Sequence, residues 1–151
     1  MDLSQCSLFA EFSPAELSGL RAITHKTVLE AGSYAFHEKD PGESLLILTV
    51  GTLHITKLSP TGDEEELAVL STGSYTGEMA FFGPGLRSAS GKALERVEII
   101  AVPYPELRAL LDAEPAVAAK FYKAVATGVV RRVHSMNENV AFLKAFLKAR
   151  D

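Results

Sequence analysis

Glycine and proline break the middle of this chain, from Thr27 to Pro103, into many short segments with the composition of strands. Turn signals recur within it at 31–32, 40–42 and 51. Many short strands with regular turns predict a mainly β fold with flanking helices, built as a β-roll or jelly roll. The core positions expected on these strands are Leu45, Ile47, Leu53, Ile55, Leu67, Val69, Val97, Ile99 and Val102.

The sequence on both sides of this tract has helical signals. Ser13 is a good N-cap, Pro14 suits the first helical position, and Glu16 completes a capping box before a short amphipathic helix. A second short helix is expected at 105–114. A third begins at Pro115 and extends to the end of the chain, with one soft point at Gly128. It would be about 54 Å long at a rise of 1.5 Å per residue, too long to cover a small β body alone.

The whole chain, residues 1–151, is interpreted as one domain, which suits its length and its 47% content of apolar residues. Three parts are expected within it. They are an N-terminal helical segment at 1–26, a β-roll at 27–104, and C-terminal helices at 105–151.

The two halves of the long helix have different apolar patterns. Val117, Phe121 and Val125 in the first half are expected to pack on the helix's own domain. The second half carries apolar residues with the 4-3-4-3-4 spacing of an a/d heptad seam, and we expect it to form a homodimer with a second copy. The seam residues are Val129, Val133, Met136, Val140, Leu143 and Leu147.

Composition argues against several classes of function. The net charge is −4, whereas nucleic-acid-binding domains are more often basic, so direct DNA or RNA binding is not expected. The single cysteine, Cys6, excludes a disulfide framework or a cysteine-rich metal site. The histidines at 25, 37, 54 and 134 are too scattered for a jelly-roll metalloenzyme. We expect no metal, no cofactor and no enzymatic activity.

The chain has no secretory signal at its N-terminus and no apolar run long enough for a membrane span. A cytoplasmic protein without a membrane partner is therefore expected.

The stretch GEMAFFGPGLRSAS does not fit a plain strand. Arg87 can form a bidentate, charge-assisted pair with a phosphate. Backbone N–H groups after Gly77 and near Ser88 and Ala89 can donate to the same oxygens. Glu78 repels a phosphate but accepts hydrogen bonds from sugar hydroxyls. The inferred ligand is a compact sugar phosphate with at least one free hydroxyl.

Taken in order, this stretch resembles the phosphate-binding cassette of cyclic-nucleotide-binding domains, the module of catabolite-activator-like regulators, protein kinase A regulatory subunits and cyclic-nucleotide-gated channels. That family typically shows Gly-Glu, an apolar run, three loop residues, Pro-Arg, a small residue, Ala, and Thr or Ser. The chain has GE, MAFF, GPG and LRSAS, without insertion or deletion. It departs at Leu86, where proline is usual, and at Thr76, where an aromatic residue often stands. The resemblance covers nearly the whole chain.

The resemblance implies roles for the cassette residues at 77–90. Glu78 would hold the ribose 2′-hydroxyl and Arg87 the cyclic phosphate, and Ser88 would add a hydroxyl. The other cassette residues that the resemblance assigns to the ligand are Gly77, Met79, Ala80 and Ala89.

The base would lie between the β-roll and the long helix. There, RRVHSMNENVAFL resembles the part of the activator's helix that reaches the purine, so the candidate contacts are Asn137 and, nearby, His134 and Met136. Asn137 can both donate and accept, so it can read either purine. The cassette and the helix look closest to the bacterial activator, which favours cAMP and leaves cGMP open.

The resemblance implies a sensor that responds to its ligand by favouring one placement of the long helix. Two alternatives share this fold. One is the sensor fragment of a transcription regulator whose helix-turn-helix is absent, since the sequence stops at Asp151. The other is a nucleotide-independent adaptor that contacts an effector protein through the helix seam.

Overall fold

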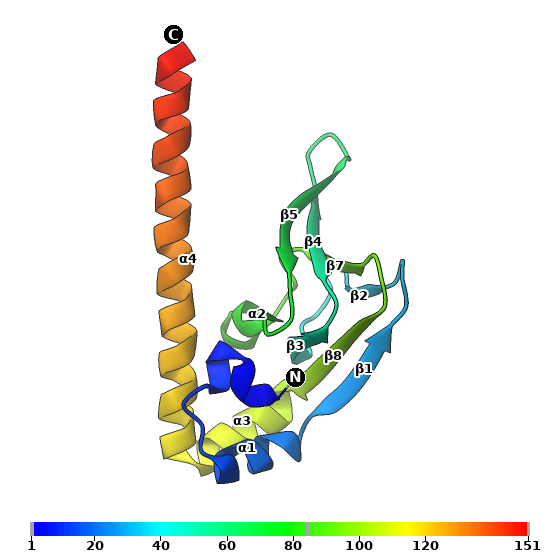
Figure 1. Ribbon diagram of the computed structural model, residues 1–151, viewed down its shortest axis with the longest axis vertical. Helices are drawn as coiled ribbons and strands as arrows, with labels where there is room; N and C mark the ends of the chain where they lie inside the picture. The colour runs from blue at the N-terminus through cyan, green and yellow to red at the C-terminus, as the bar shows by residue number, and fades with distance from the viewer. Residues whose placement is uncertain (1, 84, 151) are drawn as a thin grey trace.

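The computed structural model describes residues 2–83 and 85–150, and Pro84 of the expected cassette loop lies outside them. Two four-stranded antiparallel sheets, ordered β1-β8-β3-β6 and β2-β7-β4-β5, form the body (Figure 1). The strands are β1 His25–Leu29, β2 Tyr34–Phe36, β3 Ser44–Val50, β4 Leu53–Leu58, β5 Glu64–Leu70, β6 Tyr75–Thr76, β7 Ser90–Ala93 and β8 Val97–Pro103. The mainly β class expected from the sequence is confirmed.

Helices precede and follow the strands in the sequence, and one short helix, α2, lies between β6 and β7. They are the 3-10 turns η1 Leu3–Gln5 and η2 Ser7–Phe9, then α1 Pro14–Arg21, α2 Glu78–Phe82, α3 Tyr104–Ala113 and α4 Pro115–Arg150. A short N-terminal helix and a long C-terminal helix are therefore present, as expected. Figure 1 shows α4 rising beside the β body and continuing well beyond its own contact with it.

The core consists of two clusters, and strand β3 contributes to both. Leu45 and Ile47 face the helices, whereas Leu48 packs between the sheets. This division follows from the alternation of side chains along a strand. Six of the expected core positions are at most 3% exposed, and Ile55 is partly buried against the inter-sheet cluster. The six are Leu45, Ile47, Leu53, Val97, Ile99 and Val102.

The expectation that Leu67 and Val69 are buried was wrong, since they are 59% and 48% exposed. Both lie on β5, an edge strand of its sheet. Leu70 pairs with the buried Leu53, so Val69 points to the opposite face of the sheet. Leu67 lies in the register shift between two pairs of β4 and β5. Register, which the sequence does not reveal, put these side chains in solvent.

The N-terminal capping box is confirmed. The Glu16 amide donates to Ser13 Oγ, and the Ser13 amide donates to Glu16 Oε1 at 2.8 Å. The same Glu16 oxygen accepts from Lys120 Nζ at 2.6 Å, which ties α1 to α4. The ring of Phe9 stacks on Phe121, with centroids 6.4 Å apart. The N-terminal segment is thus packed against the first half of α4.

Helix α4 is continuous over 36 residues. Its first half packs on the domain through the buried Val117, Phe121 and Val125, which confirms the expectation for these residues. From Val129 to Arg150 every residue is exposed. Within the described ranges, no helix is long and apolar enough to cross a membrane.

Candidate ligand-binding site

The cassette begins with a glycine that no other residue can easily replace. Gly77 caps α2 with a φ of 103°, in the left-handed region. A Cβ at this position would lie 2.6 Å from Arg87 Nη1 and 2.8 Å from the Ser44 carbonyl oxygen. The absent side chain lets the backbone of α2 come against the guanidinium of Arg87.

Arg87 is a buried charge that the structure only partly satisfies. It is 8% exposed, its Nη2 donates to the Ser44 carbonyl at 2.8 Å, and its guanidinium lies 4.6 Å from the centre of the Phe36 ring. Its Nε and Nη1 atoms are buried and have no hydrogen-bond partner among the described residues. Buried charged donors are costly when left unpaired. The arrangement therefore suits an anionic acceptor.

The backbone beside Arg87 is held by the loop between β2 and β3. The Arg87 amide donates to the Asp40 carbonyl and the Lys39 amide donates to the Arg87 carbonyl, both at 2.8 Å. Leu86 forms a β-bridge with Pro41. These bonds fix the turn before Arg87 although leucine replaces the proline that is usual there.

A cavity of about 320 Å³ opens at this guanidinium. Its walls come from β2, from the loop that follows, and from β3. The lining residues are Ala35, Phe36, Asp40, Pro41, Glu43, Ser44, Leu46 and Arg87.

Glu78 is also buried, at 4% exposed, and it pairs with a residue that sequence reasoning missed. Arg132 of α4 places its Nη1 atom 2.5 Å from Glu78 Oε1. Partial burial lowers the pKa of the Arg132 guanidinium, but the charge and hydrogen bond of Glu78 and the contact with Tyr75 together outweigh it, so the net pKa is raised. The guanidinium also lies 5.8 Å from the centre of the Tyr75 ring. Glu78 thus joins the cassette to the long helix.

The remaining cassette candidates differ in their surroundings. Ala80 and Ala89 are buried, at 7% and 8% exposed, whereas Ser88 is exposed and Met79 is 64% exposed. The structure therefore brings Gly77 and Arg87 together and leaves the Ser88 and Met79 side chains in solvent.

The three candidate base contacts on α4 lie beyond Arg132. His134, Met136 and Asn137 are all exposed. At 1.5 Å per residue, Asn137 is about 7.5 Å further along the helix axis than Arg132. These three residues therefore follow, within about two helical turns, the Arg132 that pairs with Glu78, and none of them is buried.

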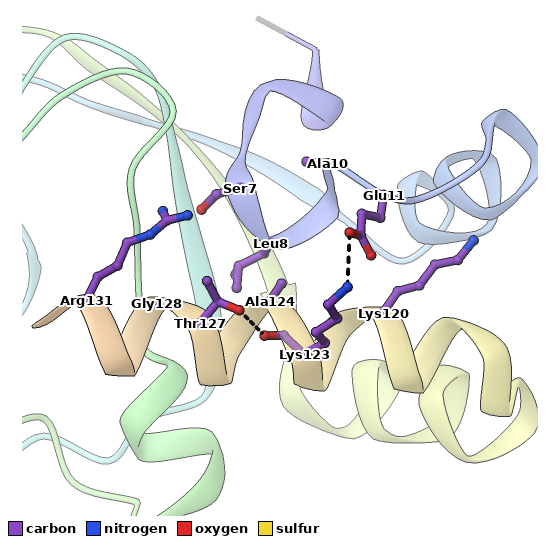
Figure 2. Close-up of a pocket in the computed structure, with 10 residues that line it drawn as sticks. All are labelled: Ser7, Leu8, Ala10, Glu11, Lys120, Lys123, Ala124, Thr127, Gly128 and Arg131. Carbon is purple, nitrogen blue, oxygen red and sulfur yellow. Dashed lines mark hydrogen bonds and ion pairs between the residues drawn. The ribbon is translucent and has the colours of Figure 1, made fainter. Parts of the chain in front are cut away.

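A second cavity, of about 230 Å³, lies between η2 and α4 (Figure 2). Its lysines are paired at its rim, Lys123 with Glu11 at 3.5 Å and Lys120 with Glu16 at 2.6 Å. None of the described cassette residues lines it. Across residues 2–83 and 85–150, no group of three or more histidine, cysteine, aspartate or glutamate side chains is placed to hold a metal ion.

Residues 26–114 match the sequence pattern of the cyclic nucleotide-binding domain family. A CRP-like cAMP-activated global transcriptional regulator of Mycobacterium tuberculosis is 25% identical over 141 residues, which cover 93% of this chain and 61% of the relative. A cyclic AMP receptor protein of Thermus thermophilus is 30% identical over 111 residues, 74% of this chain and 51% of the relative. The chain thus matches only about half to three fifths of the length of these two curated relatives.

Solved structures share the fold. The N-terminal domain of a transcriptional regulator from Streptomyces coelicolor has a TM-score of 0.77 at 34% identity, with 92% of this chain and 95% of that chain covered. The catabolite activator protein of Thermus thermophilus has a TM-score of 0.78 at 27% identity, with 91% and 63% covered.

Proposed function

The chain belongs to the cyclic nucleotide-binding domain family, and from this premise we propose that it is a sensor that binds cAMP in preference to cGMP and responds through α4. Two relatives, from Mycobacterium tuberculosis and Thermus thermophilus, are named for their response to cAMP or for being cAMP receptors, which supports this choice of ligand. The proposed unit is the single domain 1–151, with the cassette at 77–90 as its ligand-binding part.

One observation carries the proposal. Arg87 is buried, yet its Nε and Nη1 atoms have no hydrogen-bond partner among the described residues. The cyclic phosphate of a nucleotide is a singly charged anion whose oxygens accept charge-assisted hydrogen bonds, and the guanidinium of arginine is well suited to such acceptors. In this assignment Arg87 holds the phosphate, with the backbone of Gly77 and Ala89 and the Ser88 hydroxyl assisting.

We assign the ribose to Glu78, which also contacts the long helix α4 through Arg132. A buried carboxylate accepts a hydrogen bond from a 2′-hydroxyl, but Glu78 already pairs with Arg132. A ligand that engages Glu78 therefore competes with, or rearranges, a contact that holds α4 against the roll. Binding at the cassette would in this way change the placement of α4 by a population shift.

The base is assigned to the exposed face of α4 beyond Arg132, with Asn137 as the reader and with His134 and Met136 beside it. Met136 also belongs to the apolar seam, through which we propose that two copies form a homodimer.

The protein would act in the cytoplasm, without enzymatic activity, on an effector still to be identified. A second candidate is the sensor part of a longer transcription regulator, which the names of the relatives favour.

Calorimetric titration of the chain with cAMP, cGMP and a cyclic dinucleotide tests the proposal. Arg87→Ala removes one partner of a buried charge pair, which costs about 2–5 kcal/mol. Binding of cAMP should weaken about 30-fold to 4,000-fold, and Arg87→Lys should recover only part of it. Arg96→Ala is the matched control, because Arg96 is exposed and pairs with Glu98. If Arg87→Ala binds cAMP as the parent does, the sensor assignment fails.

Two further titrations separate the parts of the ligand. Glu78→Gln should weaken cAMP and have little effect on its 2′-deoxy analogue. Asn137→Ala should weaken the binding of cAMP by about 1–3 kcal/mol, and it should also narrow the difference between the affinities for cAMP and cGMP. An unchanged ratio of the two affinities would move base recognition away from Asn137.

A further inference from the structure

The cavity between the N-terminal segment and α4 gathers positive charge in a chain that is acidic as a whole (Figure 2). The net charge of the chain is −4, yet three cationic side chains line this cavity of about 230 Å³, against one carboxylate among its lining residues. Such an excess of positive charge favours an anionic ligand. We name the cavity the η2–α4 groove, and its polar walls are formed by Ser7, Glu11, Lys120, Lys123, Thr127 and Arg131.

The two walls of the groove are fixed against each other by buried contacts. On the N-terminal side, Leu8 and Phe9 are at most 1% exposed. The Phe9 ring stacks on Phe121 of α4, with the ring centroids 6.4 Å apart. At the rim, Lys120 Nζ donates to Glu16 Oε1 at 2.6 Å. The groove is therefore formed before any ligand enters, as is usual for small-molecule sites.

Arg131 supplies a donor group at one end of the groove. Consecutive residues of a helix point about 100° apart, so Arg132 reaches Glu78 whereas Arg131 extends toward Ser7 of the opposite wall (Figure 2). Arg131 forms no ion pair or side-chain hydrogen bond with any residue in 2–83 or 85–150. A guanidinium presents a planar set of donors that suits carboxylate and phosphate groups. This end of the groove can therefore hold one acid group.

Lys123 supplies a second cation further along the groove. Its Nζ atom lies 3.5 Å from Glu11 Oε1, and the two side chains are 72% and 62% exposed. Exposed pairs of this kind contribute little to stability, so a ligand anion can take the place of Glu11. Arg131 follows Lys123 by eight positions, which is about 12 Å along the helix axis. A ligand that meets both cations is therefore elongated, with an acid group at each end.

The groove is separate from the other surfaces of α4 that carry proposals. With Val133 at position a of the heptad, Thr127 and Arg131 take positions b and f, which face outward in a pair of helices. None of the described cassette residues lines the groove. The groove would therefore stay open in the proposed homodimer and in a chain with an occupied cassette.

We propose that the η2–α4 groove is a second ligand site, which binds an elongated dianion of the dicarboxylate or diphosphate class. One acid group pairs with Arg131 and accepts from the Ser7 hydroxyl, and the other pairs with Lys123. The small side chains of Ala10 and Ala124 leave room for the body of the ligand between them. A ligand held in this way links the N-terminal segment to α4. The proposal goes beyond the cyclic-nucleotide function and does not depend on it.

The test is a titration of the full chain with glutarate, pyrophosphate and acetate at constant ionic strength, followed by the NMR amide signals of residues 7–11 and 120–131. Glutarate, pyrophosphate or both should shift these signals by about 10 mM, which saturates a site with a Kd of about 1 mM. The choice between the two probes identifies the acid group. Acetate carries one charge and should bind at least about 10-fold more weakly, because it makes one charged contact fewer.

Three variants assign the effect to the groove. Arg131→Met should weaken the better dianion about 10-fold, and Lys123→Met about 5-fold. Glu11→Gln should strengthen it about 2-fold to 5-fold, because the competing carboxylate is lost. This opposite sign is not expected if the three side chains only support the fold. Arg150→Met is the matched control, since Arg150 is exposed on the same helix outside the groove, and should bind as the parent does.

The same signals separate this site from the cassette. Arg87→Ala should leave the response of residues 7–11 and 120–131 to the dianion unchanged, whether or not the parent binds a cyclic nucleotide. Loss of that response in Arg87→Ala would show that the anion binds at the cassette, and the second site would be refuted. Signals that do not shift by about 10 mM, or that sodium chloride shifts equally at the same ionic strength, also overturn the proposal. So does an Arg131→Met chain that binds with the affinity of the parent.

Discussion

Arg132 illustrates what single residues contribute, because its pair with Glu78 joins two elements that are far apart in the sequence. Glu78 is 4% exposed, whereas the Arg132 side chain is 47% exposed. Fully buried pairs cost about 3–5 kcal/mol when one partner is removed, and exposed pairs are worth about 0–1 kcal/mol. Because one partner is buried and the other is half exposed, we expect the free-energy cost of breaking this pair to lie between those of buried and exposed pairs.

We predict that Arg132→Met lowers the free energy of unfolding by about 1–3 kcal/mol, because Glu78 is left as an unpaired buried carboxylate. In the Glu78→Gln background the same substitution should cost less, because no charge remains. Urea unfolding of the four proteins gives this double-mutant cycle. Additive effects, within about 0.4 kcal/mol, would mean that the two side chains do not interact in solution.

The cassette residues and Arg132 differ in how far the sequence could reveal them. The order of residues from Gly77 to Ser90 is a local pattern, so Glu78 and Arg87 were identified as candidates before any fold was known. Arg132 lies on another element, and only the docking of α4 places it on Glu78. The only hint in the sequence that Arg132 belongs to the site was the pair of arginines at 131–132, which directly precedes the residues expected to contact the base.

At the scale of elements, the contact between α4 and β6 depends on one glycine. A Cβ on Gly128 would lie 2.5 Å from the Tyr75 hydroxyl oxygen but 3.8 Å from the ring carbon that bears it. Replacing glycine by alanine inside a helix ordinarily stabilises it by about 1 kcal/mol. Here the hydroxyl opposes that gain, so Gly128, the expected soft point of the helix, is also a place where α4 approaches Tyr75 of β6 closely.

We predict that Gly128→Ala gives no gain in stability, or a loss, in the parent protein. In the Tyr75→Phe background the same change should stabilise by about 0.5–1 kcal/mol, because the obstructing oxygen is gone. Gly19→Ala in α1 is the control, since a Cβ there meets nothing within 4 Å. Thermal unfolding of the set measures the difference. A full gain for Gly128→Ala alone would contradict the contact.

The tie between α1 and α4 makes a pH-dependent contribution to stability. Hydrogen bonds from Lys120, and then from the Ser13 backbone, lower the pKa of Glu16 below its ordinary value of 4.5. A carboxyl whose folded-state pKa is depressed stabilises the fold above its unfolded value and loses this effect as pH falls through the folded value. The contribution is therefore complete at neutral pH and disappears in acid.

Glu16→Gln keeps an acceptor for the Ser13 amide but removes the charge that faces Lys120. We predict a lower melting temperature than the parent at pH 7, and a difference that shrinks steadily as the pH falls below 4.5. The difference should also shrink in high salt, which screens exposed pairs. A constant difference between neutral and acid pH would show that the pair contributes nothing measurable.

At the scale of the whole molecule, the exposed second half of α4 is the largest unexplained feature. All six seam residues are at least 42% exposed: Val129, Val133, Met136, Val140, Leu143 and Leu147. A repeat of this spacing favours pairing of two helices. The seam lies on the part of α4 that stands clear of the β body in Figure 1.

We predict a parallel homodimer through this seam. Val133→Glu combined with Val140→Glu places like charges at the interface, and light scattering should then report a monomer at about 100 μM, where the parent is a dimer. Ala145→Glu, on the opposite face of the helix, is the control and should leave the dimer intact. A monomeric parent at that concentration refutes the homodimer.

Signals that depend on near neighbours were readable from the sequence alone. They include the capping box at Ser13, the turns that cut the β-roll, the uninterrupted α4 and the ordered cassette. Each is decided within a few residues, by hydrogen bonds or side-chain periodicity local to one element. The tertiary structure decided the exposure of Val69, the pairing of Glu78 with Arg132 and the close approach of Arg87 to Gly77. These depend on strand register and on how elements pack, and local sequence does not specify distances between groups that meet only when the chain folds.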